Sequence, residues 1–113
     1  MTYEFIDLTK SDGIATLRLN RPDALNAWNL QMREELRDAV QELVEDDDLR
    51  VAIVTGTGRA FSAGEDVRGM GDLTDVGPKG FRRRVRMIHN VFDEIEQMEI
   101  PVIAAINGVA AGG

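Results

Sequence analysis

The chain has 113 residues, enough for one modest domain and too few for two. Hydrophobic residues make up 43% and charged residues 29%, so a folded core is feasible and general disorder is excluded. The net charge of −7 argues against nucleic acid and anionic membranes as partners, because both repel an acidic surface. The absence of cysteine excludes disulfides and a thiol nucleophile, and argues against a zinc site of the usual kind.

The N-terminus gives no sign of a targeting segment. Residues 1–4 lack the basic region and following apolar stretch of a signal peptide. No apolar run approaches the length needed to span a membrane. We therefore expect a cytoplasmic protein with no membrane partner.

The first half of the chain predicts a hairpin, a helix and a strand. Residues 3–8 and 14–19 are short apolar runs on either side of a Lys-Ser-Asp-Gly turn signal, and alternate side chains of the second run share one face. Asn29 is a suitable N-cap for a helix over about 30–45, where apolar residues recur at helical spacing. Residues 50–55 form a β-branched run typical of a strand buried on both faces.

The second half predicts a loop, a helix and another strand. Residues 70–80 are rich in glycine and proline, so we expect a mobile loop there. Apolar side chains at helical spacing predict an amphipathic helix over 81–98, and residues 101–106 predict a second buried strand. Strands and helices that alternate in this way define the α/β class with parallel crossovers. Because no helix follows to cover the last strand, we expect the chain to be incomplete.

Three stretches that contain glycine are candidates for a ligand site. Gly56–Phe61 follows a strand, as an NAD or FAD loop would, but Phe61 replaces the third glycine of that motif and a tight turn explains the stretch as well. Phe61–Val67 and Asn107–Gly113 also follow strands. Each could direct backbone N–H groups into a cleft and stabilise an oxyanion there. A capped loop and a closely packed turn are the alternatives.

The other candidate side chains indicate less chemistry. Four arginines near the start of the second helix could hold a phosphate, although a solvated helix face explains them as well: Arg82, Arg83, Arg84 and Arg86. His89, the only histidine, could act as a base but is explained equally by a surface position. Trp28 and Met32 are predicted to be packing residues.

Four stretches resemble the crotonase (enoyl-CoA hydratase/isomerase) superfamily in order and spacing. They are residues 20–27, 54–56, 59–67 and 100–113. The resemblance covers essentially the whole chain, and four linked motifs are far more specific than any one of them. It implies a ClpP/crotonase fold of repeated ββα units, with residues 1–113 as its truncated N-terminal part, and a homotrimer or dimer of trimers at full length.

The resemblance also implies an acyl-CoA substrate and no separate cofactor, since CoA is part of the substrate. Family members polarise the thioester carbonyl with two backbone N–H groups, which correspond here to those of Glu65 and Gly113. Hydratases often carry a small residue at position 65, but a main-chain donor requires no particular side chain. The positions that correspond to CoA-binding residues are Ala24, Leu25, Ala63, Gly64, Asp66, Val67 and Arg68.

The resemblance implies, first of all, the activity of an enoyl-CoA hydratase, which is a lyase. Hydratases of the family add water with two glutamates that lie beyond the position of Gly113. The sequence therefore leaves open an enoyl-CoA isomerase, an acyl-CoA hydrolase or a ring-processing CoA enzyme. A non-catalytic fragment that only binds partner subunits is the alternative from a different class.

Overall fold

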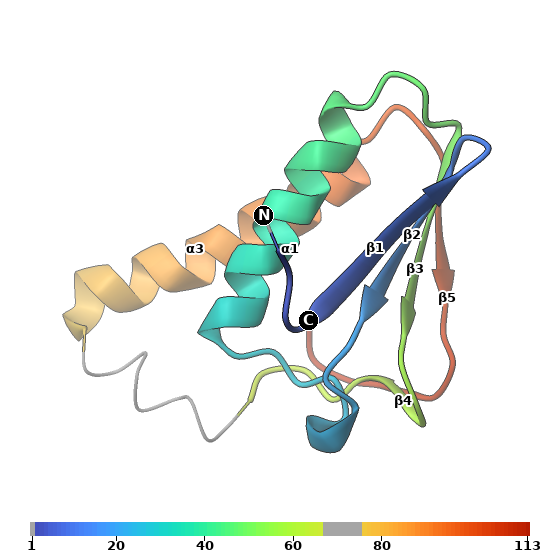
Figure 1. Cartoon of the computed structure of the whole chain (residues 1–113). Coiled ribbons are helices and arrows are strands. Elements are labelled where there is room, and N and C mark those ends of the chain that lie inside the picture. Colours follow the sequence, from blue (N-terminus) through green and yellow to red (C-terminus); the bar gives the residue numbers. More distant parts are fainter. Residues whose placement is uncertain (1, 67–75) are drawn as a thin grey trace.

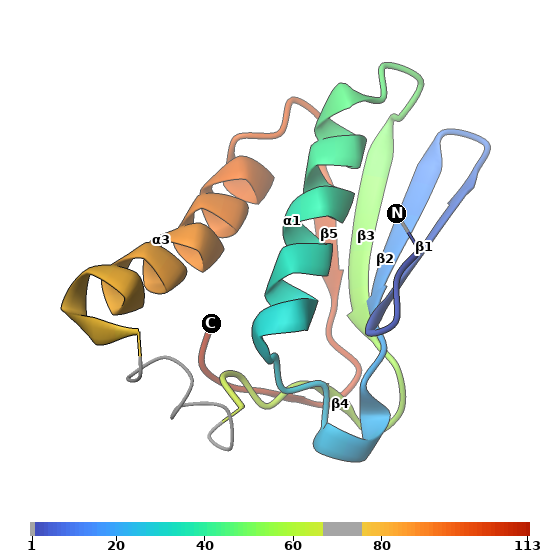
Figure 2. The ribbon, with the colours of Figure 1, turned by 60° about the vertical axis from the view of Figure 1, so that its left-hand side comes forward.

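The computed structural model of the chain describes residues 2–66 and 76–113. A four-stranded sheet in the order β1-β2-β3-β5 carries helices α1 and α3 on one of its faces (Figures 1 and 2). A short parallel pair, β4 and β6, lies beyond one end of the sheet. The elements are β1 (Ile6–Ser11), β2 (Ile14–Leu19), the 3-10 helix η1 (Pro22–Ala24), α1 (Leu30–Glu45), β3 (Val51–Gly56), β4 (Ala60–Ser62), α3 (Gly77–Glu96), β5 (Val102–Ala105) and β6 (Val109–Ala110).

The pairing of the strands confirms the α/β prediction. Strands β1 and β2 form the expected antiparallel hairpin, while β2 pairs with β3, and β3 with β5, in parallel. The predicted bounds of the first strand were wrong, because β1 begins at Ile6 and includes Lys10. The backbone N–H groups of Glu4 and Phe5 both donate to Glu35 Oε1 at 2.8 Å, which ties these residues to α1 rather than to a strand.

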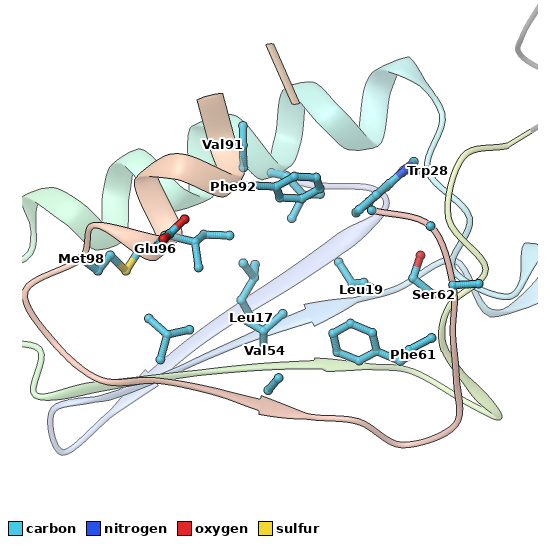
Figure 3. Close-up of a pocket in the computed structure, with 18 of the residues that line it drawn as sticks. Leu17, Leu19, Trp28, Val54, Phe61, Ser62, Val91, Phe92, Glu96 and Met98 are labelled. Atoms are coloured by element: carbon cyan, nitrogen blue, oxygen red, sulfur yellow. The ribbon is translucent and has the colours of Figure 1, made fainter. Parts of the chain in front are cut away.

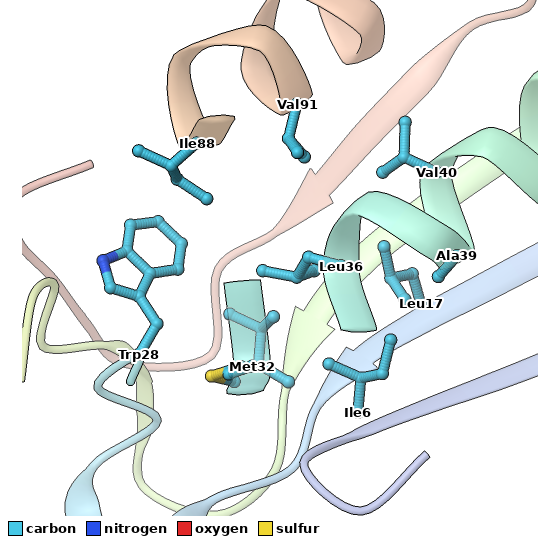
Figure 4. Close-up of a cluster of buried hydrophobic side chains, with 10 residues drawn as sticks. Ile6, Leu17, Trp28, Met32, Leu36, Ala39, Val40, Ile88 and Val91 are labelled. Atoms are coloured by element: carbon cyan, nitrogen blue, oxygen red, sulfur yellow. The ribbon is translucent and has the colours of Figure 1, made fainter. Parts of the chain in front are cut away.

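Helix α1 supplies most of the core. The side chain of Asn29 accepts a hydrogen bond from the Met32 N–H at 2.9 Å, which confirms the predicted N-cap. Met32 and Val40 are almost completely buried against Leu17 of β2. Trp28 closes one end of this cluster, as Figure 4 shows, so both predicted packing residues belong to the core.

Helix α3 packs on α1 and makes few contacts with the sheet. It begins at Gly77, so the expected loop was wrong for residues 77–80, because proline is tolerated in the first turn of a helix. The rest of that expected loop, residues 70–75, lies outside the described residues. Within the described ranges, no helix is long and apolar enough to cross a membrane.

The prediction that residues 50–55 form a strand buried on both faces was wrong, and the strand predicted over 101–106 is exposed, as expected for a last strand that no helix follows. Ala52 alone is fully buried in β3, and Ile103 of β5 is 52% exposed. Both helices lie on the same face of the sheet, and alternation in a strand places Ile53 and Ile103 on the other face. Strand β5 also lies at the edge of the sheet.

We expect residues 1–113 alone to self-associate and to bind an apolar dye, because β5 presents an unpaired apolar edge. Ile103→Lys should reduce both signals in light scattering and dye fluorescence. Thr9→Lys, on the exposed outer face of β1, adds the same charge at the opposite edge and is the control. A monomeric wild-type chain with a cooperative unfolding transition would contradict this prediction.

Candidate active site

The side chain of Asn26 is completely buried and connects three parts of the chain. Its Oδ1 accepts from the Arg21 N–H at 2.8 Å, while its Nδ2 donates to the carbonyls of Thr57 and Ala60 at 3.0 and 2.8 Å. Its own carbonyl accepts from Ser62 Oγ at 2.9 Å. Asn26 adopts a left-handed conformation, with φ of 55°, which asparagine tolerates better than most residues.

A second asparagine holds the same turn from the C-terminal side. Asn107 Nδ2 donates to the carbonyls of Gly58 and Ala60 at 2.9 and 3.0 Å, and its Oδ1 accepts from the Gly56 N–H at 3.1 Å. The turn from β3 to β4 is therefore fixed by two amide side chains. The Gly56–Phe61 stretch is explained by this turn, because a Cβ on Gly56 would lie 2.6 Å from the Ala60 carbonyl oxygen.

Residues 62–66 form the middle strand-like segment of the site. On one side, Ala63 N–H donates to the Leu25 carbonyl, Trp28 N–H to the Gly64 carbonyl and Asp66 N–H to the Trp28 carbonyl, at 2.9–3.1 Å. On the other side, β4 pairs with β6, and Ala111 N–H donates to the Ser62 carbonyl at 3.0 Å. Together with the hydrogen bond between Gly56 and Asn107, these contacts bring together all four stretches that carry the family resemblance.

Gly64 is the point at which two of these segments touch. It is buried, with φ of 91°, and its N–H donates to Ser62 Oγ at 3.0 Å. A Cβ on Gly64 would lie 2.7 Å from the Ala111 carbonyl oxygen, and one on Gly112 would lie 3.2 Å from Gly64 Cα. Glycine is required at this crossing both by the backbone angle and by the lack of space.

The crossing determines the direction of the Glu65 backbone N–H. Glu65 forms a parallel bridge with Trp28, in which the backbone of Trp28 bonds the two residues on either side of Glu65, Gly64 and Asp66. The N–H of Glu65 itself therefore points away from Trp28. On that side lies Gly112, where a Cβ would stand 3.9 Å from the Glu65 nitrogen. The two glycine stretches therefore meet at the Glu65 amide. Whether the N–H groups of Glu65 and Gly113 act as donors stays a prediction.

The side chain of Glu65 forms an ion pair with Arg33 of α1. Arg33 is only 3% exposed, and its Nε has no hydrogen-bond partner among the described residues. Burial lowers the pKa of Arg33, and the nearby cation of Arg84 lowers it further. No sequence pattern predicted this pair, because its partners are 32 positions apart and lie in different parts of the fold.

Asp66 forms the second ion pair of the segment. Its carboxylate lies 2.8 Å from Arg21 Nη1, and both side chains are largely buried. Arg21 also donates to the Ala27 carbonyl at 2.7 Å and stacks over the ring of Phe5, with its guanidinium carbon 5.4 Å from the ring centroid. These contacts hold η1 and the following turn against residues 63–66.

An apolar cavity of about 530 Å³ lies between α3 and the sheet (Figure 3). Trp28 and Phe92, whose ring centroids are 5.3 Å apart, line it together with Leu17, Val54 and Gly113. A Cβ on Gly113 would lie 2.6 Å from the Trp28 ring. Gly113 therefore stands at the cavity wall, on the same side of the molecule as the Gly64 crossing.

The remaining predicted residues fall into three groups. Ala24 and Leu25 are half-buried at the end of η1 and adjoin Ala63, so these proposed CoA positions do lie together. Val67 and Arg68 lie outside the described residues. The arginines of α3 are mostly exposed, which favours the interpretation as a solvated helix face: Arg82, Arg83 and Arg86 are open to solvent and Arg84 is half-buried. His89 is also exposed.

Comparison with known proteins gives the family. Residues 9–113 match the family model described as enoyl-CoA hydratase/isomerase. The chain is 41% identical over its whole length to the crotonyl-CoA hydratase of Syntrophomonas wolfei, and 36% identical over 96% of its length to the 1,2-epoxyphenylacetyl-CoA isomerase of Escherichia coli. It superposes on an enoyl-CoA hydratase/carnithine racemase of Magnetospirillum magneticum with a TM-score of 0.89, at 32% identity and over 98% of its length.

The chain belongs to the enoyl-CoA hydratase/isomerase, or crotonase, family, and it has the crotonase fold. It matches the N-terminal portion of that family. The chain spans 43% of the length of the Syntrophomonas hydratase, 42% of the Escherichia isomerase and 42% of the Magnetospirillum chain.

Asn26→Ala should destabilise a full-length protein that carries this chain by at least about 2 kcal/mol, because the Thr57 carbonyl and the Arg21 N–H would lose this partner and the buried Ala60 carbonyl would keep only Asn107. Urea unfolding measures the change. Asn90→Ala removes the same side chain from an exposed site on α3 and is the control. Equal losses in the two variants would show that the Asn26 hydrogen bonds do not stabilise the fold.

Proposed function

We propose that a full-length protein carrying this chain acts on acyl-CoA thioesters, first of all as an enoyl-CoA hydratase. The observation that carries the proposal is the close crossing of Gly64 with Ala111–Gly112, which directs the Glu65 N–H toward the segment that ends at Gly113. We infer that the backbone N–H groups of Glu65 and Gly113, on these neighbouring segments, are the two donors of an oxyanion hole. The family membership supports the same reaction class.

The chemistry requires that negative charge be stabilised on a thioester oxygen. Attack on an alkene conjugated to the thioester, or loss of the proton beside it, converts the carbonyl into an enolate. Donors that are fixed before the reaction stabilise that oxygen without further reorganisation, and loss of one donor typically costs about 3–4 kcal/mol. The asparagine hydrogen bonds and the two ion pairs supply this rigidity by fixing residues 62–66 from both sides.

CoA is proposed to lie along the segments that flank this hole. Ala24 and Leu25 adjoin Ala63 through the Ala63–Leu25 hydrogen bond, and all three are half-buried. The Asp66 carboxylate is engaged by Arg21, so it contributes to the shape of the site rather than as a free charge. The remaining proposed CoA contacts come from the backbone of Gly64 and from Val67 and Arg68.

The reaction type depends on carboxylates that the family places beyond the position of Gly113. A hydratase is proposed first because the Syntrophomonas relative is named a crotonyl-CoA hydratase. An isomerase is the second candidate, because the Escherichia relative is named 1,2-epoxyphenylacetyl-CoA isomerase and shares the same region. A hydrolase, a ring-processing enzyme and a non-catalytic fragment remain as alternatives. Assay of crotonyl-CoA hydration beside enoyl-CoA isomerisation and thioester hydrolysis tests them.

The apolar cavity is not proposed as the acyl site. Gly113 lies at its wall, so the main chain that follows in a full-length protein begins there. We propose that this following segment fills much of the cavity and covers Trp28 and Phe92. Residues 1–113 alone would then lack both this cover and the family's catalytic carboxylates, so we expect no measurable hydration of crotonyl-CoA by them.

Gly64→Ala should lower kcat/KM for crotonyl-CoA by about 10²-fold or more in the full-length protein, because the new Cβ would separate the two donor segments. Gly77→Ala is a matched control: Gly77 also has a positive φ, of 76°, but a Cβ there would meet no atom within 4 Å. Steady-state kinetics of the two variants measure the difference. If both lose activity equally, the crossing is not what positions the donors.

Turnover should be unchanged by a metal chelator and by omission of nicotinamide or flavin nucleotides, because the proposed donors are backbone N–H groups. The check is the rate of crotonyl-CoA hydration before and after dialysis against EDTA. Loss of activity that zinc restores would contradict the proposal of a cofactor-free site.

The assembly and location also remain proposals. A homotrimer or dimer of trimers in the cytoplasm is what the family resemblance implies, with neither nucleic acid nor membrane as partner. Sedimentation of the full-length protein tests the oligomeric state.

A further inference from the structure

Arg33 and Glu65 form an ion pair that the proposed reaction does not explain. Arg33 lies in the first turn of α1, is 3% exposed and directs its Nη2 to the Glu65 carboxylate. Its Nε has no hydrogen-bond partner among the described residues, so Glu65 is the group that compensates the buried cation. A buried charge is costly unless it is paired, so a role other than packing is expected for this arginine.

The position of Glu65 creates an electrostatic problem at the proposed hole. Covalent geometry keeps the carboxylate oxygens within roughly 6 Å of the backbone nitrogen of the same residue. A negative charge at that distance opposes the negative charge that develops on the thioester oxygen, and the opposition is stronger where water is excluded. The Glu65 side chain is 34% exposed, so water screens its charge only in part.

We propose that Arg33 is a positioning residue that holds the Glu65 carboxylate against α1 and neutralises it, so that the Glu65 N–H acts on the substrate without an uncompensated negative charge beside it. This inference rests on the proposed thioester chemistry. Arg84 of α3 adds a second positive charge near Arg33. The arrangement explains how a carboxylate is tolerated where many hydratases carry a small residue.

The test is a double-mutant cycle in the full-length protein. Arg33→Met leaves the Glu65 charge unpaired, and kcat for crotonyl-CoA should fall by at least about tenfold with little change in KM. Arg33→Met combined with Glu65→Gln removes both charges and should regain most of kcat, although the packing of Arg33 is still lost. Arg37→Met, on the exposed side of α1, is the control and should leave kcat unchanged.

A spectroscopic probe separates this inference from the reaction type. A push–pull cinnamoyl-CoA thioester absorbs at longer wavelength when its carbonyl is polarised. Its shift on binding should shrink in Arg33→Met and return in the double variant. If Arg33→Met does not fold, Arg33→Lys, which keeps the positive charge, should keep kcat within about threefold of the wild type.

The outcomes are distinguishable. A wild-type protein that neither shifts the probe nor turns over any thioester would overturn the proposed function and this inference with it. A wild type that does both, with the single and double variants equally impaired, would overturn the inference alone, because the defect would then come from packing. A tenfold or larger loss by Arg33→Lys would likewise overturn it, since the charge is retained.

Discussion

The buried side chain of Asn26 is the contact on which the rest of the site depends. It bonds the turn at Arg21, the turn between β3 and β4 and, through its carbonyl, Ser62. Ser62 in turn accepts from the Gly64 N–H, so a continuous path of hydrogen bonds leads from Asn26 to the crossing of the two glycine segments. Because the hydrogen bonds of Asn26 with Ala60 and Ser62, and of Ser62 with Gly64, are buried, water does not replace them when they break, and the arrangement is held in a single geometry.

Charge pairs complete the support of the same segment. Arg21 holds Asp66 and Arg33 holds Glu65, so consecutive carboxylates are drawn to different elements. Such pairs contribute little net stability, because removing the charges from water offsets their attraction. Their value here is positional: they fix the orientation of two neighbouring residues whose backbone borders the proposed substrate.

The sheet, unlike the buried residues of the site, is exposed to solvent on one face. Helices α1 and α3 lie on one face, and the cavity between α3 and the sheet opens beside Trp28 and Phe92. The opposite face and the β5 edge carry exposed apolar side chains such as Ile103. Buried hydrogen bonds therefore gather at the end where β4 begins, and exposed apolar side chains lie on the opposite face of the sheet and along β5.

The sequence by itself determined the elements whose signals are local. The Asn29 cap, the hairpin, the parallel β-α-β order and the family followed from periodicity and from four linked motifs. The same patterns overestimated the burial of β3 and β5. A β-branched run shows that a strand is suited to burial, but it does not show whether another element packs against each of its faces. The tertiary structure alone decided that Gly64 meets Gly112, that Asn26 and Asn107 share the Ala60 carbonyl, and that Arg33 pairs with Glu65. These contacts join residues far apart in the chain, and their partners are fixed only when the sheet registers bring the segments together.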